Sequence, residues 1–189
     1  MTTLIRASLL ALAMGAALTG PLAVDLNGRP ITDLAPAGAR AVVLFFAASD
    51  CPISNRYIPE VQRLAKQFEP LGVRVWFVYP NPGDDANVVR AHNLEFAITA
   101  STALDRRQTI TRMAQVTITP EAAVFVPQGT SLHEVYRGRI DDRYLALGTE
   151  RPQAMHHDLQ EAIRAVLAGK PVSQPAGPPI GCSIVTLQP

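Results

Sequence analysis

Alternating stretches of apolar and mixed residues divide the chain into predicted strands and helices. Residues 41–46 form an uncharged apolar run, as expected for a strand that is buried on both faces of a sheet. Residues 73–79 have the same largely apolar character and predict a second central strand. Between them, apolar residues recur at helical spacing from Val61 to Phe68, which predicts a helix over about 52–68. This half of the chain therefore contains a predicted β-α-β unit.

Two shorter signals flank this unit. Over residues 24–31, apolar residues lie on both sides of Asn27-Gly28, and this dipeptide is a strong short-range signal of a β-hairpin. After the second strand, residues 84–92 predict a short helix with Asp84 as its N-terminal cap. We therefore expect a small N-terminal hairpin and a second helix.

The second half of the chain continues the α/β pattern. Residues 122–126 and 132–137 predict two strands, and the Pro-Gln-Gly-Thr sequence between them favours a turn, so the strands should form a hairpin. Residues 157–168 carry one apolar stripe and predict an amphipathic helix that ends before Gly169 and Pro171. The resulting order, β-α-β-α-β-β-α, predicts an α/β fold with a central sheet flanked by helices.

The N-terminal residues 1–23 have the character of a targeting segment. The only charged side chain is Arg6, and the apolar run over 9–18 is followed by Thr-Gly-Pro. This order is typical of a secretory signal peptide, and the run is shorter than the about 20 residues that a transmembrane helix needs. A buried N-terminal helix and an uncleaved anchor are the alternatives. Cleavage would leave a periplasmic or secreted protein with no stable membrane span.

Length and composition favour one globular domain. The chain has 189 residues, of which 48% are hydrophobic and 17% charged, and this allows a sizeable core. We divide it into the predicted signal peptide (1–23), the domain (24–170) and a Pro/Gly-rich tail (171–189) that carries Cys182. The net charge is 17 − 16 = +1 without blocks of like charge, so the chain lacks the electrostatic signature of a nucleic-acid-binding protein.

The chain has two cysteines, Cys51 and Cys182, which in an oxidising compartment could be a disulfide, a redox pair or soft-metal ligands. Cys51 lies between a predicted buried strand and a predicted helix, where unpaired backbone N–H groups and the positive helix end stabilise a thiolate. Pro52 fits the first helical turn. The alternative is a small buried apolar residue, but the polar neighbours Ser49 and Asn55 favour a reactive thiol.

Cys51-Pro52-Ile53-Ser54 after a strand, with Pro59 further along the helix, resembles the active-site turn of the thioredoxin superfamily. Thr119-Pro120 before the strand 122–126 resembles that superfamily's cis-proline loop. Segments 25–28, 50–60 and 181–184 resemble secreted bacterial redoxins of the alkyl-hydroperoxide-reductase and thiol-specific-antioxidant branch. The resemblance implies a thioredoxin-like fold with a central mixed β-sheet. It also implies a thiol–disulfide oxidoreductase that acts on protein or small-molecule thiols and disulfides and needs no cofactor.

The sequence departs from the usual motif at one position. The second cysteine, three residues after the first, is replaced by Ser54, so a disulfide within this turn is excluded. A mixed disulfide at Cys51 must then be released by an external thiol or by Cys182. Cys182 could also be a lone tail cysteine or half of a permanent structural bridge. We expect Ser54 to hydrogen-bond the Cys51 sulfur.

The resemblance assigns roles around Cys51. It implies that Pro52 tunes the thiolate and contacts the substrate together with Thr119, while Pro120 supports the partner peptide. A thiol peroxidase is the nearest alternative enzyme. Peroxiredoxins place a threonine or serine three residues before the reactive cysteine and a proline four residues earlier, where this chain has Ala48 and Leu44. Three arginines could complete such a site: Arg112, Arg137 and Arg139.

A metal-binding protein without turnover is the alternative from another functional class. Copper or zinc could use Cys51, Cys182, His156 and His157, but this spacing does not define a site, and no metal ligand is assigned. The two histidines favour a polar start to the last helix.

Other polar and aromatic residues have simpler interpretations. We interpret Asp84-Asp85 and Asp141-Asp142 as solvated turns or caps, and Trp76 as a core residue. Glu121 is a candidate proton acceptor for Cys51.

Overall fold

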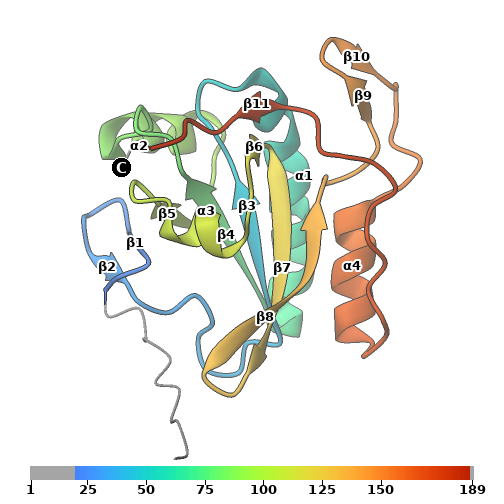
Figure 1. Cartoon of the computed structure of the whole chain (residues 1–189), viewed down its shortest axis with the longest axis horizontal. Coiled ribbons are helices and arrows are strands. Elements are labelled where there is room, and N and C mark those ends of the chain that lie inside the picture. Colours follow the sequence, from blue (N-terminus) through green and yellow to red (C-terminus); the bar gives the residue numbers. More distant parts are fainter. Residues whose placement is uncertain (1–19, 188–189) are drawn as a thin grey trace, which may run out of the picture.

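The computed structural model describes residues 20–187 of the chain. The prediction of a signal peptide depends mainly on residues 1–19, which lie outside this part. A seven-stranded mixed sheet forms the centre of the molecule, with the strand order β2-β1-β5-β4-β3-β7-β8 (Figure 1). Its strands are β1 (Ala23–Val24), β2 (Pro30–Ile31), β3 (Ala41–Phe46), β4 (Val73–Tyr79), β5 (Ser101–Leu104), β7 (Glu121–Gln128) and β8 (Ser131–Gly138).

Within residues 20–187, four α-helices and two small sheets complete the fold. The helices are α1 (Pro52–Phe68), α2 (Ala86–Glu95), α3 (Thr109–Met113) and α4 (Asp158–Leu167), and a short 3₁₀ turn, η1 (Glu69–Leu71), follows α1. One small sheet pairs β9 (Tyr144–Ala146) with β10 (Thr149–Glu150), and the other pairs β6 (Ile118–Thr119) with β11 (Cys182–Ser183). The architecture confirms the predicted α/β class with helices on both sides of a central mixed sheet.

The central strands separate two apolar layers. Alternate residues of β3 point to opposite faces of the sheet, so Val43 and Phe45 contact the layer that includes α1 and α4, whereas Leu44 and Phe46 contact the layer that includes α3. All six residues of β3 are buried. Two-sided burial explains why this strand has no polar alternation, as the sequence predicted.

Several predicted elements are confirmed, including the bounds of β3, β4 and α1. The N-terminal hairpin is the antiparallel pair β1–β2, and β7–β8 is the second hairpin. The cap of α2 was predicted one residue too early. Asp85 caps this helix, because its carboxylate accepts hydrogen bonds from the backbone N–H groups of Asn87 at 2.7 Å and Val88 at 3.0 Å.

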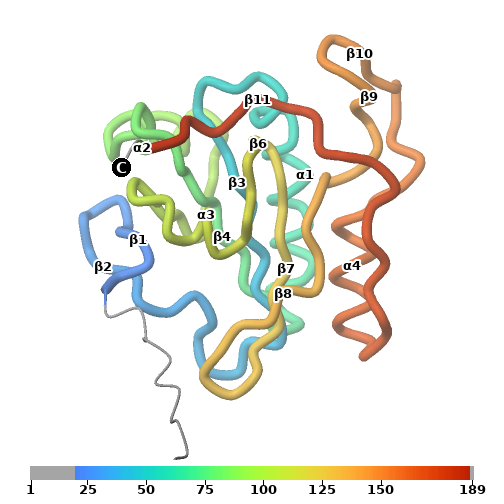
Figure 2. The backbone as a smooth tube through the Cα atoms, in the orientation of Figure 1, coloured from blue at the N-terminus to red at the C-terminus, as the bar shows by residue number. Residues whose placement is uncertain are grey.

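The sequence did not predict β5, α3 or the two small sheets. The strand β5 has four residues and α3 has five, and both are too short for a recognisable periodicity. The tail after α4 is extended, as predicted. It returns along the molecule to the end of the sheet where α1 begins, and there it forms β11 (Figure 2).

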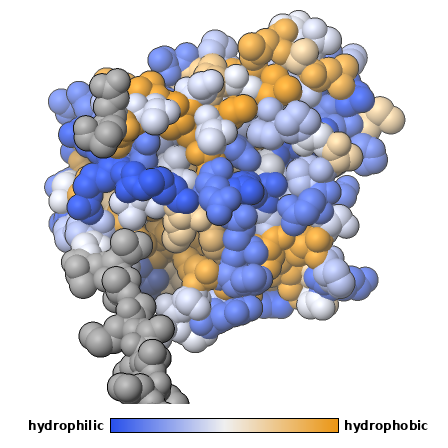
Figure 3. All heavy atoms as spheres, in the orientation of Figure 1, coloured by the Kyte–Doolittle hydropathy of each residue, from blue (hydrophilic) through white to orange (hydrophobic). Residues whose placement is uncertain are grey.

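The surface is a mixture of polar and apolar side chains. One concentration of apolar side chains lies over the β9–β10 hairpin, at the upper right of Figure 3, where Leu145 and Leu147 are exposed. Within residues 20–187, no helix combines the length and the apolar character needed to cross a membrane.

Candidate active site

Cys51 lies at the junction of the central sheet and the longest helix. It is the N-cap of α1, with extended backbone angles, and Pro52 is the first helical residue. The Cys51 backbone N–H donates to the Ala48 carbonyl at 3.2 Å. The N–H groups of the first helical turn begin at Ile53, because Pro52 has none, so they and the positive end of the helix lie close to the thiol.

The second component of the site is the loop between β6 and β7. The Thr119–Pro120 peptide bond is cis, as the thioredoxin resemblance implies. The Cys51 thiol donates a hydrogen bond to the Thr119 carbonyl oxygen at a Sγ–O distance of 3.4 Å. Because Thr119 is fully buried, this contact holds the Cys51 sulfur inside the protein, and only 1% of Cys51 is exposed.

Cys182 reaches the same place from the C-terminal tail. It lies opposite Thr119 in the antiparallel β6–β11 pair, and Thr119 is the residue whose carbonyl oxygen accepts the Cys51 S–H. Burial, followed by the neighbouring Cys51 and Asp50, raises the pKa of Cys182 to about 12. Both cysteines are free thiols. The fold thus brings together two sulfurs that are 182 − 51 = 131 positions apart in the sequence.

Gly181 allows the tail to approach this loop. A Cβ atom at this position would lie 2.1 Å from the Thr119 carbonyl oxygen and 2.9 Å from Pro120 Cδ. Neither is the free end of a flexible side chain, so a larger residue would have to displace the backbone. The contact between Cys182 and Cys51 therefore depends on a glycine immediately before Cys182.

Ser54 lies beside the thiol loop but does not make the predicted contact. Its side chain is fully buried, and its Oγ accepts a hydrogen bond from the Ala48 backbone N–H at 3.3 Å. Within residues 20–187, Ser54 and the Cys51 sulfur do not hydrogen-bond. The hydroxyl instead fixes the loop that leads from β3 to Cys51.

Asp84 also supports this loop, although the sequence indicated only a cap or a solvated turn. It is 3% exposed and accepts hydrogen bonds from the Ser49 hydroxyl and from the Ser49 backbone N–H, the latter at 3.1 Å. Burial raises the pKa of Asp84, and its Oδ2 is buried without a hydrogen-bond partner. The sequence signal that could have identified Asp84 as part of the site is its position shortly after the end of a buried parallel strand.

A chain of polar side chains extends behind the loop, from half-buried Asn55 to buried His92 and Tyr79. Asn55 Nδ2 donates to the Ser49 carbonyl at 3.0 Å, and Asn55 Oδ1 lies 2.9 Å from His92 Nε2. The other ring nitrogen of His92 lies 2.9 Å from the Tyr79 hydroxyl. Burial lowers the pKa of His92. The sequence identified Asn55 only as a polar neighbour of Cys51. It gave no signal for His92 or Tyr79, because the three residues belong to different elements, α1, α2 and β4.

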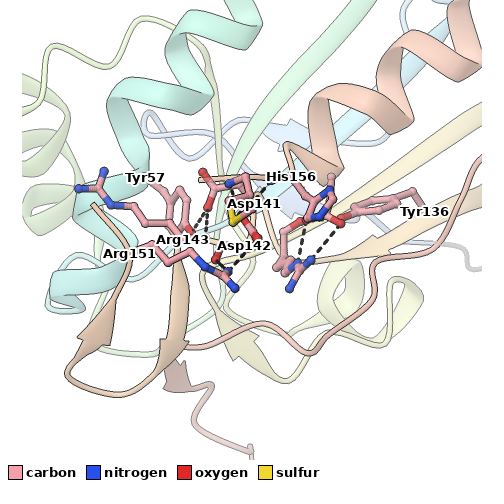
Figure 4. Close-up of polar contacts among 10 residues, drawn as sticks. Tyr57, Tyr136, Asp141, Asp142, Arg143, Arg151 and His156 are labelled. Carbon is pink, nitrogen blue, oxygen red and sulfur yellow. Dashed lines mark hydrogen bonds and ion pairs between the residues drawn. The ribbon is translucent and has the colours of Figure 1, made fainter. Parts of the chain in front are cut away.

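The acidic pair Asp141-Asp142 is structural, and the prediction of a solvated turn was wrong. Figure 4 shows both carboxylates within a hydrogen-bonded cluster. Asp141 accepts a hydrogen bond from the Tyr57 hydroxyl at 2.5 Å, and Asp142 is bound by Arg151 and by two backbone N–H groups. The prediction failed because buried donors from α1 and from the loop before α4 satisfy these acids. The cluster fixes that loop against α1.

Glu121 is buried, and the groups that influence its carboxylate are other than Cys51. Burial raises its pKa to about 7, Arg137 and the Thr117 backbone oppose this rise, and Glu134 adds to it. These contacts do not support the prediction that Glu121 accepts a proton from Cys51. In β7, Glu121 is two residues before Ala123, so it is on the α3 side of the sheet.

The three arginines considered for a peroxide site bind other groups. Arg137 donates to the backbone of Ala114 and Gln115, Arg112 donates to the Arg107 carbonyl, and Arg139 forms an ion pair with Asp158 at 2.8 Å.

The side chains considered as metal ligands do not form a larger cluster. In the described part of the chain, no three His, Cys, Asp or Glu side chains gather in an arrangement suited to a metal ion.

Comparison with protein families matches residues 16–133 to the AhpC/TSA family. No curated protein matches the chain. Among solved structures, an uncharacterized conserved protein from Geobacillus kaustophilus is 24% identical, with a TM-score of 0.71 and 87% of each chain covered. A hypothetical protein from Sinorhizobium meliloti is 22% identical, with a TM-score of 0.72, covering 86% of this chain and 88% of that one.

A third similar structure has a described activity. It is a secreted Mycobacterium tuberculosis disulfide oxidoreductase, described as homologous to Escherichia coli DsbE. It is 17% identical to this chain and has a TM-score of 0.51, with 78% of this chain and 93% of that one covered. At these identities the similarity shows the fold, which is thioredoxin-like. The family match includes Cys51 and the Thr119–Pro120 bond and ends before Cys182.

Proposed function

The chain belongs to the AhpC/TSA family and has a thioredoxin-like fold, and from this premise we propose that it is a thiol–disulfide oxidoreductase in which Cys51 attacks and Cys182 resolves. One observation carries the proposal: the β6–β11 pair places Cys182 opposite Thr119, and the carbonyl oxygen of Thr119 accepts the S–H of Cys51, so both cysteines meet at this residue. A resolving thiol must reach the sulfur of the mixed disulfide, and this arrangement brings Cys182 to Cys51.

The reaction transfers two electrons to a partner disulfide. Cys51 loses its proton to solvent, and the thiolate attacks one partner sulfur, while the other partner sulfur leaves as a thiolate. Cys182 then loses its proton and attacks Cys51 Sγ, which breaks the mixed disulfide and releases the second partner thiolate. The products are a Cys51–Cys182 disulfide and a partner dithiol, and the reverse sequence would oxidise a partner.

The surroundings of the two sulfurs favour this order of attack. Cys182, with a pKa raised to about 12, stays protonated at neutral pH and is a poor first nucleophile. Once Cys51 is bonded to a partner, it carries no negative charge that would oppose ionisation of Cys182. Burial still raises the pKa of Cys182, but Cys182 loses its proton more readily than it does beside a Cys51 thiolate.

The partner is a protein or small-molecule thiol or disulfide. We assign Pro52, Thr119 and Pro120 to its contact surface, because these residues surround Cys51. Ser54 supports the loop rather than resolving the disulfide. The reaction belongs to an oxidising compartment, the periplasm or the cell exterior. The sequence of residues 1–23 supports this, and so does the secreted disulfide oxidoreductase that shares the fold.

A thiol peroxidase is the second candidate, favoured by the family match. In that reaction the Cys51 thiolate attacks a hydroperoxide, the O–O bond breaks, an alcohol (or water, from hydrogen peroxide) leaves, and Cys51 becomes a sulfenic acid. Cys182 then condenses with the sulfenic acid and releases water. Both reactions yield the same Cys51–Cys182 disulfide. They differ in the oxidant, so a direct comparison of substrates distinguishes them.

The test measures reduction of a peptide disulfide by stoichiometric reduced protein, with hydrogen peroxide in a parallel arm. Cys51→Ser should lower the rate to the uncatalysed background, and Cys182→Ser should accumulate a mixed disulfide that intact mass detects. Ser54→Cys is the matched variant, because it restores the usual second motif cysteine beside Cys51. In the double variant Ser54→Cys/Cys182→Ser, the introduced thiol at position 54 should release the mixed disulfide. Full activity in Cys51→Ser would overturn the proposal, and reaction with peroxide alone would favour the peroxidase.

A further inference from the structure

The proposed attacking sulfur is buried beneath the C-terminal segment. Cys51 is 1% exposed, and its Sγ lies against the Thr119 carbonyl and the Cys182 thiol. We propose that residues 171–187, the C-terminal strap, form a gate that must leave β6 before a partner disulfide reaches Cys51, and that the Cys51–Cys182 disulfide locks this gate closed. The locking step rests on the proposed function, whereas the covering of Cys51 does not.

Few interactions hold the end of the strap that covers the thiol. No residue of the strap is buried, so it contributes little apolar surface to the core. Beyond the β6–β11 pair, Ile184 N–H donates to the Thr117 carbonyl at 2.9 Å, and Val185 is held by the side chains of Asn81 and Gln108. A segment with few buried contacts opens locally at a small fraction of the free energy of global unfolding.

The middle of the strap has separate contacts, which define where it would pivot. Gln174 Nε2 donates to the Val135 carbonyl at 3.0 Å, and Pro175 packs against Gly138, where an added Cβ would lie 2.4 Å from Pro175 Cγ. Between this anchor and Gly181 the sequence is Ala-Gly-Pro-Pro-Ile. The end of the strap can therefore leave β6 while residues 174–175 stay docked on β8.

The locked state determines which sulfur a reductant meets. Cys182 is partly exposed and Cys51 is buried, so an external thiolate attacks Cys182 Sγ. The Cys51–Cys182 bond breaks, Cys51 leaves as a thiolate, and the reductant becomes bonded to Cys182. A second reductant thiolate then attacks the reductant sulfur, which forms the oxidised reductant and releases the Cys182 thiolate. The gate is then free to open for the next partner.

Gly181→Ala tests the gate without removing either thiol. The added Cβ would collide with the Thr119 backbone and push the strap off β6. Gly177→Ala is the matched control within the strap, because its Cβ would meet only the end of the Arg139 side chain, at 3.0 Å from Nη1, and no backbone atom. The reduced full-length proteins are treated with iodoacetamide, and peptide mass mapping gives the alkylation rate of Cys51.

We expect Gly181→Ala to raise the Cys51 alkylation rate by about tenfold or more, and Gly177→Ala to stay within about twofold of wild type. Asn81 lies outside the strap, and its side chain accepts a hydrogen bond from the Val185 N–H of the strap. Asn81→Ala should therefore raise the Cys51 alkylation rate by about fivefold, which gives a second, independent variant that opens the gate. Equal rates in wild type and both opening variants would overturn the gate. Faster alkylation without disulfide exchange activity would support the gate and reject the proposed function.

Discussion

At the scale of single residues, the site depends on atoms that meet Cys51 from distant parts of the chain. Thr119 supplies the carbonyl that accepts its S–H, and Cys182 supplies the second thiol. Cys51 and the Thr119–Pro120 bond were recognisable because each has a local sequence signature. Asn55 and His92 had no such signature, because their roles arise only when α1 and α2 pack together.

Glu121 provides a residue-scale prediction about stability. Burial raises its pKa from 4.5 to about 7, so the folded chain holds a proton that the unfolded chain releases between these values. Stability should therefore fall as pH rises from about 4.5 to 7 and then level off. Glu121→Gln should remove this slope and stabilise the protein by about 2 kcal/mol at pH 8. Urea unfolding of both proteins at pH 5 and pH 8 measures this, and parallel pH profiles would contradict it.

At the scale of elements, the loop between β3 and α1 is fixed from several sides. Ser54 binds Ala48, while Asp84 and Asn55 bind Ser49. The long elements were predictable because burial on both faces, or on one helical stripe, leaves a pattern over many residues. The strands β6 and β11 have two residues each and leave no pattern, so the docking of the tail was not predictable.

The adjacent acids Asp84 and Asp85 have different roles, because Asp84 supports the loop that precedes α1 and Asp85 caps α2. Asp85→Ala removes the cap of α2 and should lower the denaturant midpoint of unfolding without changing the reactivity of Cys51. Asp84→Ala removes two hydrogen bonds from Ser49 and should change the Cys51 alkylation rate several-fold, because the thiol loop loses a support. Denaturant unfolding and alkylation kinetics provide the two readouts. Identical alkylation rates in both variants would show that Asp84 does not position the loop.

At the scale of the whole molecule, the strap brings the C-terminal part of the chain back to the beginning of α1 (Figure 2). A disulfide between Cys51 and Cys182 would close a loop over most of the domain. The chain-entropy treatment gives about 5 kcal/mol of stabilisation for a loop of this length. The oxidised protein should therefore unfold at a clearly higher urea concentration than the reduced one. Cys182→Ser is the control, and its unfolding midpoint should not respond to oxidant.

The central claim is that Cys51 and Cys182 form one reversible disulfide within a single chain. The most direct measurement is the intact mass of the purified protein after oxidation with diamide and alkylation with N-ethylmaleimide, with and without prior reduction. Oxidised wild type should be lighter by two hydrogens and take up no maleimide. After reduction, it should take up two maleimides. Cys182→Ser should not form this intramolecular link. If oxidised wild type keeps both thiols free, or if the disulfide joins two chains, the account is contradicted.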